Sequence, residues 1–307
     1  MAVYKPEGSL IGSKTNIAAL KSPSALQEAF LQGKILEARA TCCDCEHNLI
    51  LDLGCMKGVI PRAEAAVGIE AGDVRDIAII SRVNKPTCFK ILCFAKQEDG
   101  TDYAILSRRA VQEECRKQYI DRLTGGDIIP VSITRLEPFG CFVDIACGII
   151  SMIPIDFISV SRISHPCDRF QNGQNIYAVV KSIDDCGKIT LSHKELLGTW
   201  EQNAQDFHIG ETVSGIIRSV ESYGVFVELT PNLAGLAEPK EGVMAGQHAS
   251  VYIKNLIPDK MKVKLIIIDS FDAQYTQSEP KYFIDSNHID RFVYSPPQSQ
   301  KRIETVF

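Results

Sequence analysis

Hydrophobic and polar residues alternate in two stretches of nearly the same pattern, residues 137–145 and residues 221–229. In each stretch every second residue after a central glycine is apolar, which predicts the buried face of a β-strand. Phe142 falls on the opposite, polar face, and Phe226 has the matching place in the second stretch. An aromatic ring in such a place is poorly positioned for a core. It is well positioned to stack on a flat ligand such as a nucleic-acid base.

Each stretch belongs to a longer series of short predicted strands, and the series occurs three times. The middle copy has predicted strands at 128–136, 141–146, 149–153, 175–183 and 188–192. The third copy has them at 212–220, 225–229, 235–237, 248–257 and 262–268. The first copy is looser, with segments at 35–41, 48–53, 58–61, 74–83, 87–95 and 102–107. Five short strands favour a small closed barrel over a sandwich, with an extra hairpin in the first copy.

Helical stretches separate the copies at 107–123 and 192–207, and Ser22 followed by Pro23 predicts the start of a helix over 24–32. The sequence therefore predicts a mainly β fold of three tandem five-stranded barrels joined by short helices. The predicted parts are an N-terminal segment with a short helix (1–30), a barrel (31–110), a linker helix (111–123), a second barrel (124–197), a linker helix (198–207), a third barrel (208–270) and a tail without a fold of its own (271–307).

The charge balance restricts how such barrels could hold a nucleic acid. A formal net charge of −5 weighs against binding that depends on neutralising many phosphates. Stacking on aromatic rings, with a few local Lys and Arg contacts, suits single strands better than duplexes.

The location of the protein is predicted from what its sequence lacks. No apolar run approaches the ~18 residues that span a bilayer, and residues 1–21 lack the apolar stretch of a signal peptide. The 11 cysteines are odd in number and lack the spacing of a small secreted disulfide framework. Reduced thiols and a cytoplasmic location are therefore expected.

Neither a cofactor nor catalysis is predicted. Cys42 and Cys45 form a C-x-x-C close to His47, but a zinc site needs a second pair, and Cys88 and Cys93 are spaced too widely. The chain has no phosphate-binding G-x-x-x-x-G-K-S/T loop, no H-E-x-x-H and no G-x-S-x-G. We expect a binding protein and no enzyme.

The middle copy resembles the S1-type RNA-binding domain, an oligonucleotide-binding barrel that is repeated in bacterial ribosomal protein S1. The resemblance is carried by Phe-Gly-Cys-Phe-Val-Asp at 139–144, Arg-Ile-Ser-His-Pro at 162–166 and Lys-Ile-Thr-Leu-Ser at 188–192. It covers most of residues 124–197. The third copy matches mainly at 223–229, and the first only at short segments around 51–54, 58–61 and 106–109.

The resemblance implies an RNA-binding face of two aromatic residues, a histidine, an acidic residue and a basic residue. In the middle copy these positions hold Phe139, Phe142, Asp184 and Lys188, with Pro154 at the histidine position. In the third copy they hold Tyr223, Phe226 and Lys262, with Glu238 at the histidine position. In the first copy His47 and Ile50 replace the aromatic residues, and base stacking is not expected there.

Further side chains are candidates for contact with RNA. Gly140 and Gly224 are expected to form bulges that turn both rings of a copy onto one surface. Basic side chains that would contact phosphates are Arg135, Lys181, Lys188, Arg218, Lys260, Lys262 and Lys264, and His165 lies in the loop at 162–166. Simpler roles remain open: the rings could pack under a loop, the lysines could line a solvated strand face, and His165 could shape its loop.

Together these patterns predict a non-catalytic protein that binds single-stranded RNA, such as mRNA, in translation. The first barrel is expected to act as a docking module, with the small ribosomal subunit as its partner. The alternative is a protein-interaction scaffold that docks on the ribosome or on a nuclease and hardly touches RNA. No membrane or small-molecule substrate is expected.

Overall fold

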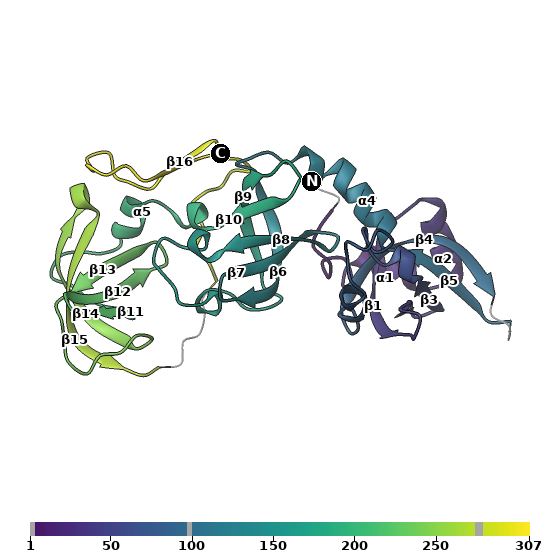
Figure 1. Cartoon of the computed structure of the whole chain (residues 1–307), viewed down its shortest axis with the longest axis horizontal. Helices are drawn as coiled ribbons and strands as arrows, with labels where there is room; N and C mark the ends of the chain where they lie inside the picture. Colours follow the sequence, from purple (N-terminus) through teal and green to yellow (C-terminus); the bar gives the residue numbers. More distant parts are fainter. Residues whose placement is uncertain (1–3, 97–99, 274–278) are drawn as a thin grey trace. The chain divides into compact units, whose positions relative to one another are not determined.

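The computed structural model describes residues 4–96, 100–273 and 279–307, and its strands form three closed five-stranded barrels (Figure 1). The first barrel contains β1 (Leu36–Cys43), β2 (Leu49–Asp52), β3 (Lys57–Ile60), β4 (Pro86–Lys96) and β5 (Asp102–Ser107). The second contains β6 (Ile128–Glu137), β7 (Gly140–Ala146), β8 (Ile149–Pro154), β9 (Asn175–Ile183) and β10 (Ile189–Ser192). The third contains β11 (Thr212–Glu221), β12 (Gly224–Thr230), β13 (Leu233–Ala237), β14 (His248–Ile257) and β15 (Lys262–Phe271). The predicted fold class is confirmed.

All three barrels have the same strand order, in which the third strand pairs with the fifth and the fourth closes onto the first. The pair between the third and fifth strands is parallel in each barrel. The chain divides into two compact units, residues 1–123 with 144–150 and residues 124–143 with 151–307. Most of the second barrel, all of the third and the described C-terminal segment thus belong to one unit.

The inward face of the repeated stretch is as the alternation predicts. Cys141 and Val143 on β7, and Val225 and Val227 on β12, are completely buried. In the third barrel these valines pack in a core that also contains Val251, Ile253 and Leu265 from the strands opposite. The alternating apolar positions therefore define the interior of each barrel.

Short helices precede and join the barrels: α1 (Lys14–Leu20), α2 (Pro23–Leu31), α3 (Ile77–Ile80), α4 (Arg109–Gln118) and α5 (Trp200–Ala204). The helix predicted from Ser22 and Pro23 is present, and the Ser22 hydroxyl accepts a hydrogen bond from the backbone N–H of Ala25 at 3.2 Å. α5 is shorter than predicted, because Gly198 has a φ of +87° and a new helix start at Thr199 follows it. Among the described residues no helix is long and apolar enough to cross a membrane.

The strand predicted at 74–83 is wrong. This segment contains the helix α3, and the first barrel has five strands without an extra hairpin in the described residues. Only Ile79 of α3 is buried, while Ile77 and Ile80 remain exposed. A short run of isoleucines does not separate helix from strand, because periodicity needs more residues than this run has.

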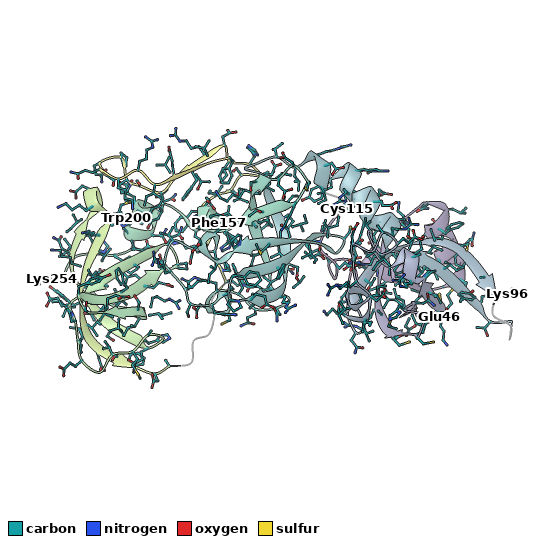
Figure 2. The ribbon with its side chains drawn as sticks, in the orientation of Figure 1. Glu46, Lys96, Cys115, Phe157, Trp200 and Lys254 are labelled. Carbon is teal, nitrogen blue, oxygen red and sulfur yellow. The ribbon has the colours of Figure 1, made fainter. Side chains whose placement is uncertain are left out.

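The described C-terminal segment, residues 279–307, packs against the barrels of the second unit and ends in a hairpin of β16 (Arg291–Val293) and β17 (Glu304–Val306). The backbone N–H of Ile128 donates to the carbonyl of Asn287 at 2.9 Å, and the N–H of Trp200 donates to the carbonyl of Tyr294 at 3.0 Å. Tyr294 is buried in the core cluster of the third barrel together with Trp200, which Figure 2 labels. This segment therefore connects to the second barrel at Ile128 and to the core of the third barrel at Trp200.

His193 lies between this tail and the second barrel and is 1% exposed. Its Nδ1 is 3.1 Å from the carbonyl oxygen of Ile158, so Nδ1 carries the hydrogen in a neutral ring and donates it. Nε2 then accepts from the hydroxyl of Tyr282 at 3.3 Å, and that hydroxyl oxygen accepts from the N–H of Tyr177 at 3.1 Å. Burial lowers the pKa of His193 to about 4, which keeps the ring neutral.

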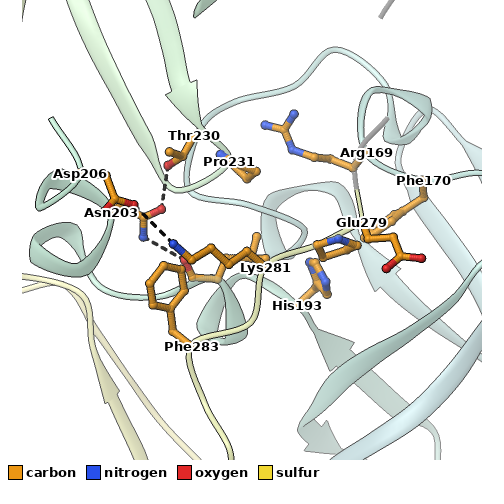
Figure 3. A pocket seen from close by; sticks show the side chains of 12 residues that line it. Arg169, Phe170, His193, Asn203, Asp206, Thr230, Pro231, Glu279, Lys281 and Phe283 are labelled. Atoms are coloured by element: carbon orange, nitrogen blue, oxygen red, sulfur yellow. Dashed lines mark hydrogen bonds and ion pairs between the residues drawn. The ribbon is translucent and has the colours of Figure 1, made fainter. Parts of the chain in front are cut away.

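A cavity of about 180 Å³ adjoins His193 and is lined by Phe170, Asn203 and residues of the tail (Figure 3). The Asn203 amide donates to the carbonyls of Leu197 and Thr199, both at 2.9 Å, and its oxygen accepts from the hydroxyl of Thr230 at 2.7 Å. The polar groups of the Asn203 side chain thus have partners within the protein. The cavity is a gap between packed segments of the second unit.

The buried imidazole predicts that the second unit loses stability on acidification. The pKa of His193 is below that of an exposed histidine, so the unfolded chain binds a proton below pH 6.5 while the folded chain does not. The free energy of unfolding should therefore fall between pH 6.5 and pH 4, by about 3 kcal/mol from this residue. Urea denaturation of wild type and His193→Gln at several pH values checks this. A variant with the same dependence on pH as wild type would contradict it.

Candidate nucleic-acid interface

Two pairs of aromatic rings lie on the outside of the second and third barrels. We call them the aromatic pairs: Phe139 with Phe142, and Tyr223 with Phe226. Within each pair the rings stand edge to face, with centroids 6.0 Å and 6.2 Å apart and planes at 87° in both cases. Phe139 is 55% exposed and Tyr223 is 65% exposed, while the second ring of each pair is half-buried. Both pairs present ring surface to solvent, as stacking on a base requires.

A glycine between the two rings of each pair allows the backbone to approach the neighbouring strand. A Cβ atom on Gly140 would lie 2.4 Å from the carbonyl oxygen of Ile153, and one on Gly224 would lie 2.6 Å from that of Ala237. No side chain fits in such a gap. The aromatic pairs therefore depend on glycine at these two positions.

The bulge that brings the rings together is displaced from the predicted position. In the third barrel the register shifts between Ile217 and Ser219 of β11, opposite Phe226, and not at Gly224. Tyr223 occupies the tight turn between β11 and β12, where Glu221 pairs with Gly224. The turn and the bulge on the partner strand thus place both rings on one surface.

In the third barrel the aromatic pair borders a groove of about 550 Å³, the third-barrel groove. The strand registers place Phe226 beside Leu236, and Leu236 beside Lys264. The other side chains that line the groove include Tyr223, Met261, Lys262, Lys254 and Glu238. The structure thus brings the predicted residues Tyr223, Phe226 and Lys262 together, and Lys264 with them. Lys260 is exposed on the turn before β15 and is not among the lining residues.

Lys254 belongs to this groove but was missed from the sequence. It lies on β14, and its Nζ is 3.0 Å from Oε1 of Glu238 (Figure 2 labels Lys254 on the third barrel). Asn255, the next residue, pairs with Lys264, and the register shifts between Ile253 and Asn255. The alternation of the buried residues Ala249, Val251 and Ile253 already places Lys254 on the outer face of β14, and this signal could have identified it from the sequence.

Arg218 was predicted to contact RNA phosphates, but its side chain is largely buried and binds acidic residues of the protein. Its Nε is 2.8 Å from Oε2 of Glu228, its Nη1 is 3.5 Å from Asp168, and its side chain is 12% exposed. Arg169, from the loop between β8 and β9, binds the same Glu228 oxygen at 2.5 Å. These four residues form the ion-pair network that links the second barrel's loop to the third barrel. The acidic residue beside Phe226 thus has a structural role.

Asp144 has the matching place beside Phe142 and is also buried. Its Oδ2 accepts from the backbone N–H of Glu7 at 2.8 Å, and both of its oxygens accept from the N–H of Gly148 at about 3 Å. Burial raises the pKa of Asp144 to about 7. In both copies the outward-facing acid of the repeated stretch is therefore covered by other parts of the protein.

The remaining predicted residues of the second barrel lie on its surface without forming a comparable groove. Asp184 Oδ1 accepts from the N–H groups of Cys186 and Lys188 at 3.0 Å and 2.8 Å, so this carboxylate fixes a turn. Arg135 is exposed and forms an ion pair with Glu137. Lys188 is exposed.

His165 shapes its own loop, which was the simpler of the two roles considered for it. Its Nδ1 accepts a hydrogen bond from the N–H of Cys167 at 3.1 Å, at the start of a short helical turn. Asp168 accepts from the N–H of His165 in return. The His165 side chain is half-buried.

In the described part of the first barrel, the positions that match the aromatic pairs hold no aromatic ring. His47 stands in a turn with a φ of +63°, and Ile50 is half-buried on β2. Cys42 and Cys45 are exposed free thiols. Over residues 4–96, 100–273 and 279–307 no cluster of His, Cys, Asp and Glu side chains could hold a metal ion.

Comparison with known proteins agrees with the barrel geometry. Residues 122–194 match the model of the S1 RNA binding domain. The resemblance inferred from residues 139–144, 162–166 and 188–192 is confirmed by this match. It covers the second barrel, in which the first aromatic pair lies.

Two ribosomal proteins are similar to most of the chain. A small ribosomal subunit protein bS1 homolog of Bacillus cereus is 29% identical over 297 residues, which cover 89% of this chain and 74% of that protein. Small ribosomal subunit protein bS1 of Staphylococcus aureus is 27% identical over 304 residues, covering 92% and 75%. A crystal structure of a multidomain protein with nucleic acid binding domains from Streptococcus pneumoniae matches 79% of this chain and 76% of its own, at 11% identity and a TM-score of 0.25.

The close approach at Gly224 predicts that Gly224→Ala destabilises the second unit. The added methyl group must push β12 away from the carbonyl of Ala237, at a cost of about 1–3 kcal/mol in the free energy of unfolding. Urea denaturation followed by the fluorescence of Trp200 measures this, since Trp200 packs in the core of the third barrel. Ser222→Ala, in the exposed turn beside Tyr223, is the control and should change stability little. Equal stability of the two variants would contradict the steric argument.

The ion-pair network predicts a larger loss for Glu228→Gln. The substitution leaves Arg169 and Arg218 buried without their shared carboxylate, which should lower the free energy of unfolding by about 3–5 kcal/mol. The same fluorescence measurement applies. Glu221→Gln removes an exposed carboxylate from the end of β11 and should have an effect within about 0.5 kcal/mol. A small loss in Glu228→Gln would mean that water or Asp168 compensates the arginines.

Proposed function

We propose that this chain is a non-catalytic protein that binds single-stranded RNA in translation, with unpaired bases stacked on the aromatic pairs. One observation carries the proposal: an exposed edge-to-face pair of rings occurs at the same place in two successive barrels. The match of residues 122–194 to the S1 RNA binding domain supports it. The similarity to ribosomal proteins of two bacteria along most of the chain supports a place in translation.

Stacking would provide much of the affinity, and lysines would add phosphate contacts. Each good stack on an aromatic ring contributes about 1–3 kcal/mol by alanine substitution. Lys262 and Lys264 adjoin the rings of the third barrel, so phosphates on either side of a stacked base would lie within their reach. Each phosphate neutralised adds roughly −0.7 to the dependence of log affinity on log salt. A protein with a net charge of −5 would bind with a shallow salt dependence.

The first barrel would serve as a docking module for the small ribosomal subunit in the cytoplasm. His47 and Ile50 replace the aromatic pair there, so its contribution to base stacking would be small. The same feature favours the scaffold alternative, in which all three barrels contact protein partners and RNA binding is weak. The two functions differ in whether affinity for RNA depends on the rings.

The proposal predicts that Phe142→Ala combined with Phe226→Ala weakens binding of labelled oligo-uridine. Loss of one stack on each barrel should cost about 1–3 kcal/mol per ring. Each ring removed should therefore weaken the affinity for RNA about fivefold to more than a hundredfold. Fluorescence anisotropy titration at fixed salt measures this. Phe271→Ala, which removes an exposed ring that stacks on His248 away from the third-barrel groove, is the control. Unchanged affinity in the double variant would favour the scaffold.

A further inference from the structure

The third-barrel groove contains a carboxylate that phosphate binding does not explain. Glu238, directly after β13, lines this groove together with the rings of Tyr223 and Phe226. Three lysines line it as well. A carboxylate at this place repels an RNA phosphate and would weaken backbone binding. Its chemistry suits another part of a nucleotide, the N–H groups on the edge of a base.

The Glu238 carboxylate is open to a ligand. Its side chain is 70% exposed, and its partner Lys254, at 3.0 Å from Oε1, is 53% exposed. An ion pair between exposed side chains contributes little to stability, so a ligand can displace it at small cost. Lys254 would then be free to contact a neighbouring phosphate, and the carboxylate would accept hydrogen bonds from the base.

We infer that Glu238 gives the third barrel a preference for guanine, an inference that rests on the proposed RNA binding. A base that stacks on Tyr223 or Phe226 directs its edge along the groove that Glu238 lines. Guanine presents two adjacent donors there, N1–H and the 2-amino group, which match the two oxygens of a carboxylate. Charge-assisted bonds of this two-point kind are the strong ones. Uracil offers one N–H between two carbonyl oxygens, and adenine and cytosine each offer one amino group.

The second barrel lacks this carboxylate. Pro154, at the end of β8, has the place in the repeated pattern that Glu238 has 84 residues later. Proline has no side-chain acceptor. The preference for guanine therefore belongs to the third barrel alone, and stacking on the second barrel remains indifferent to the base.

A titration of the full chain with Phe142→Ala, which weakens the second barrel, tests the inference. Labelled heptauridine is compared with the same oligonucleotide carrying one central guanosine. We expect about tenfold tighter binding of the guanosine oligonucleotide, which corresponds to about 1.4 kcal/mol. Central inosine lacks the 2-amino group and should lose most of this gain. Equal affinity for all three oligonucleotides would overturn the inference and leave the proposed function intact.

Glu238→Gln in the same background identifies the residue. Glutamine keeps one acceptor oxygen but places an amino group against the donors of guanine, so the preference should fall to less than about twofold. Affinity for heptauridine should stay the same or rise, because a negative charge is removed. Glu241→Gln removes an equal charge from the same loop outside the groove and should keep the preference. A preference that survives in Glu238→Gln would overturn the inference, and failure of heptauridine to bind the otherwise wild-type chain would instead overturn the proposed function.

Discussion

The close contact between a glycine and the carbonyl of the neighbouring strand governs the outer surface of the second and third barrels. Gly140 lies against Ile153, and Gly224 lies against Ala237, at distances that exclude any side chain. The strands can therefore meet at the glycine, and in the third barrel the turn that holds Tyr223 and the bulge in β11 place both rings on one surface. Rings that would otherwise be split between the two faces of a strand become one exposed surface, which the proposed stacking requires. The glycine shared by the repeated stretches 137–145 and 221–229 reflects this steric constraint.

The acidic side chains beside these rings bind other parts of the protein. Glu228 holds Arg169 and Arg218 in a buried network, and Asp144 accepts hydrogen bonds from the backbone of Glu7 and Gly148. A buried ion pair adds little net stability compared with apolar packing, but any arrangement that leaves it unpaired is strongly disfavoured. The network thus fixes the loop of the second barrel against the third. Two stacking surfaces on one rigid unit would bind a strand with less loss of freedom than two independent domains.

The C-terminal segment extends this rigidity. Tyr282 connects the backbone of β9 to the neutral ring of His193, and Tyr294 completes the core around Trp200. These contacts lie away from the aromatic pairs, so the tail braces the second unit and leaves the rings exposed. The groove of the third barrel combines exposed rings, lysines and one carboxylate. In the proposed function this combination would hold a nucleotide by the face and the edge of its base and by its phosphate.

The sequence by itself determined the barrels and the rings. Alternation fixes which residues of β7 and β12 face the core, because a strand has a period of two and only one face can be apolar. It also identified Tyr223, Phe226 and Lys262, which line one groove because β13 pairs with both β12 and β15 and Tyr223 occupies the turn before β12. Only the tertiary structure decided the partners of Arg218 and Lys254: Arg218 is bound by an acid from its own barrel and by Asp168 from another, and Lys254 meets Glu238 at the third-barrel groove. Contacts between segments distant in sequence, and single-residue shifts of register, leave no mark on the local pattern of polar and apolar residues.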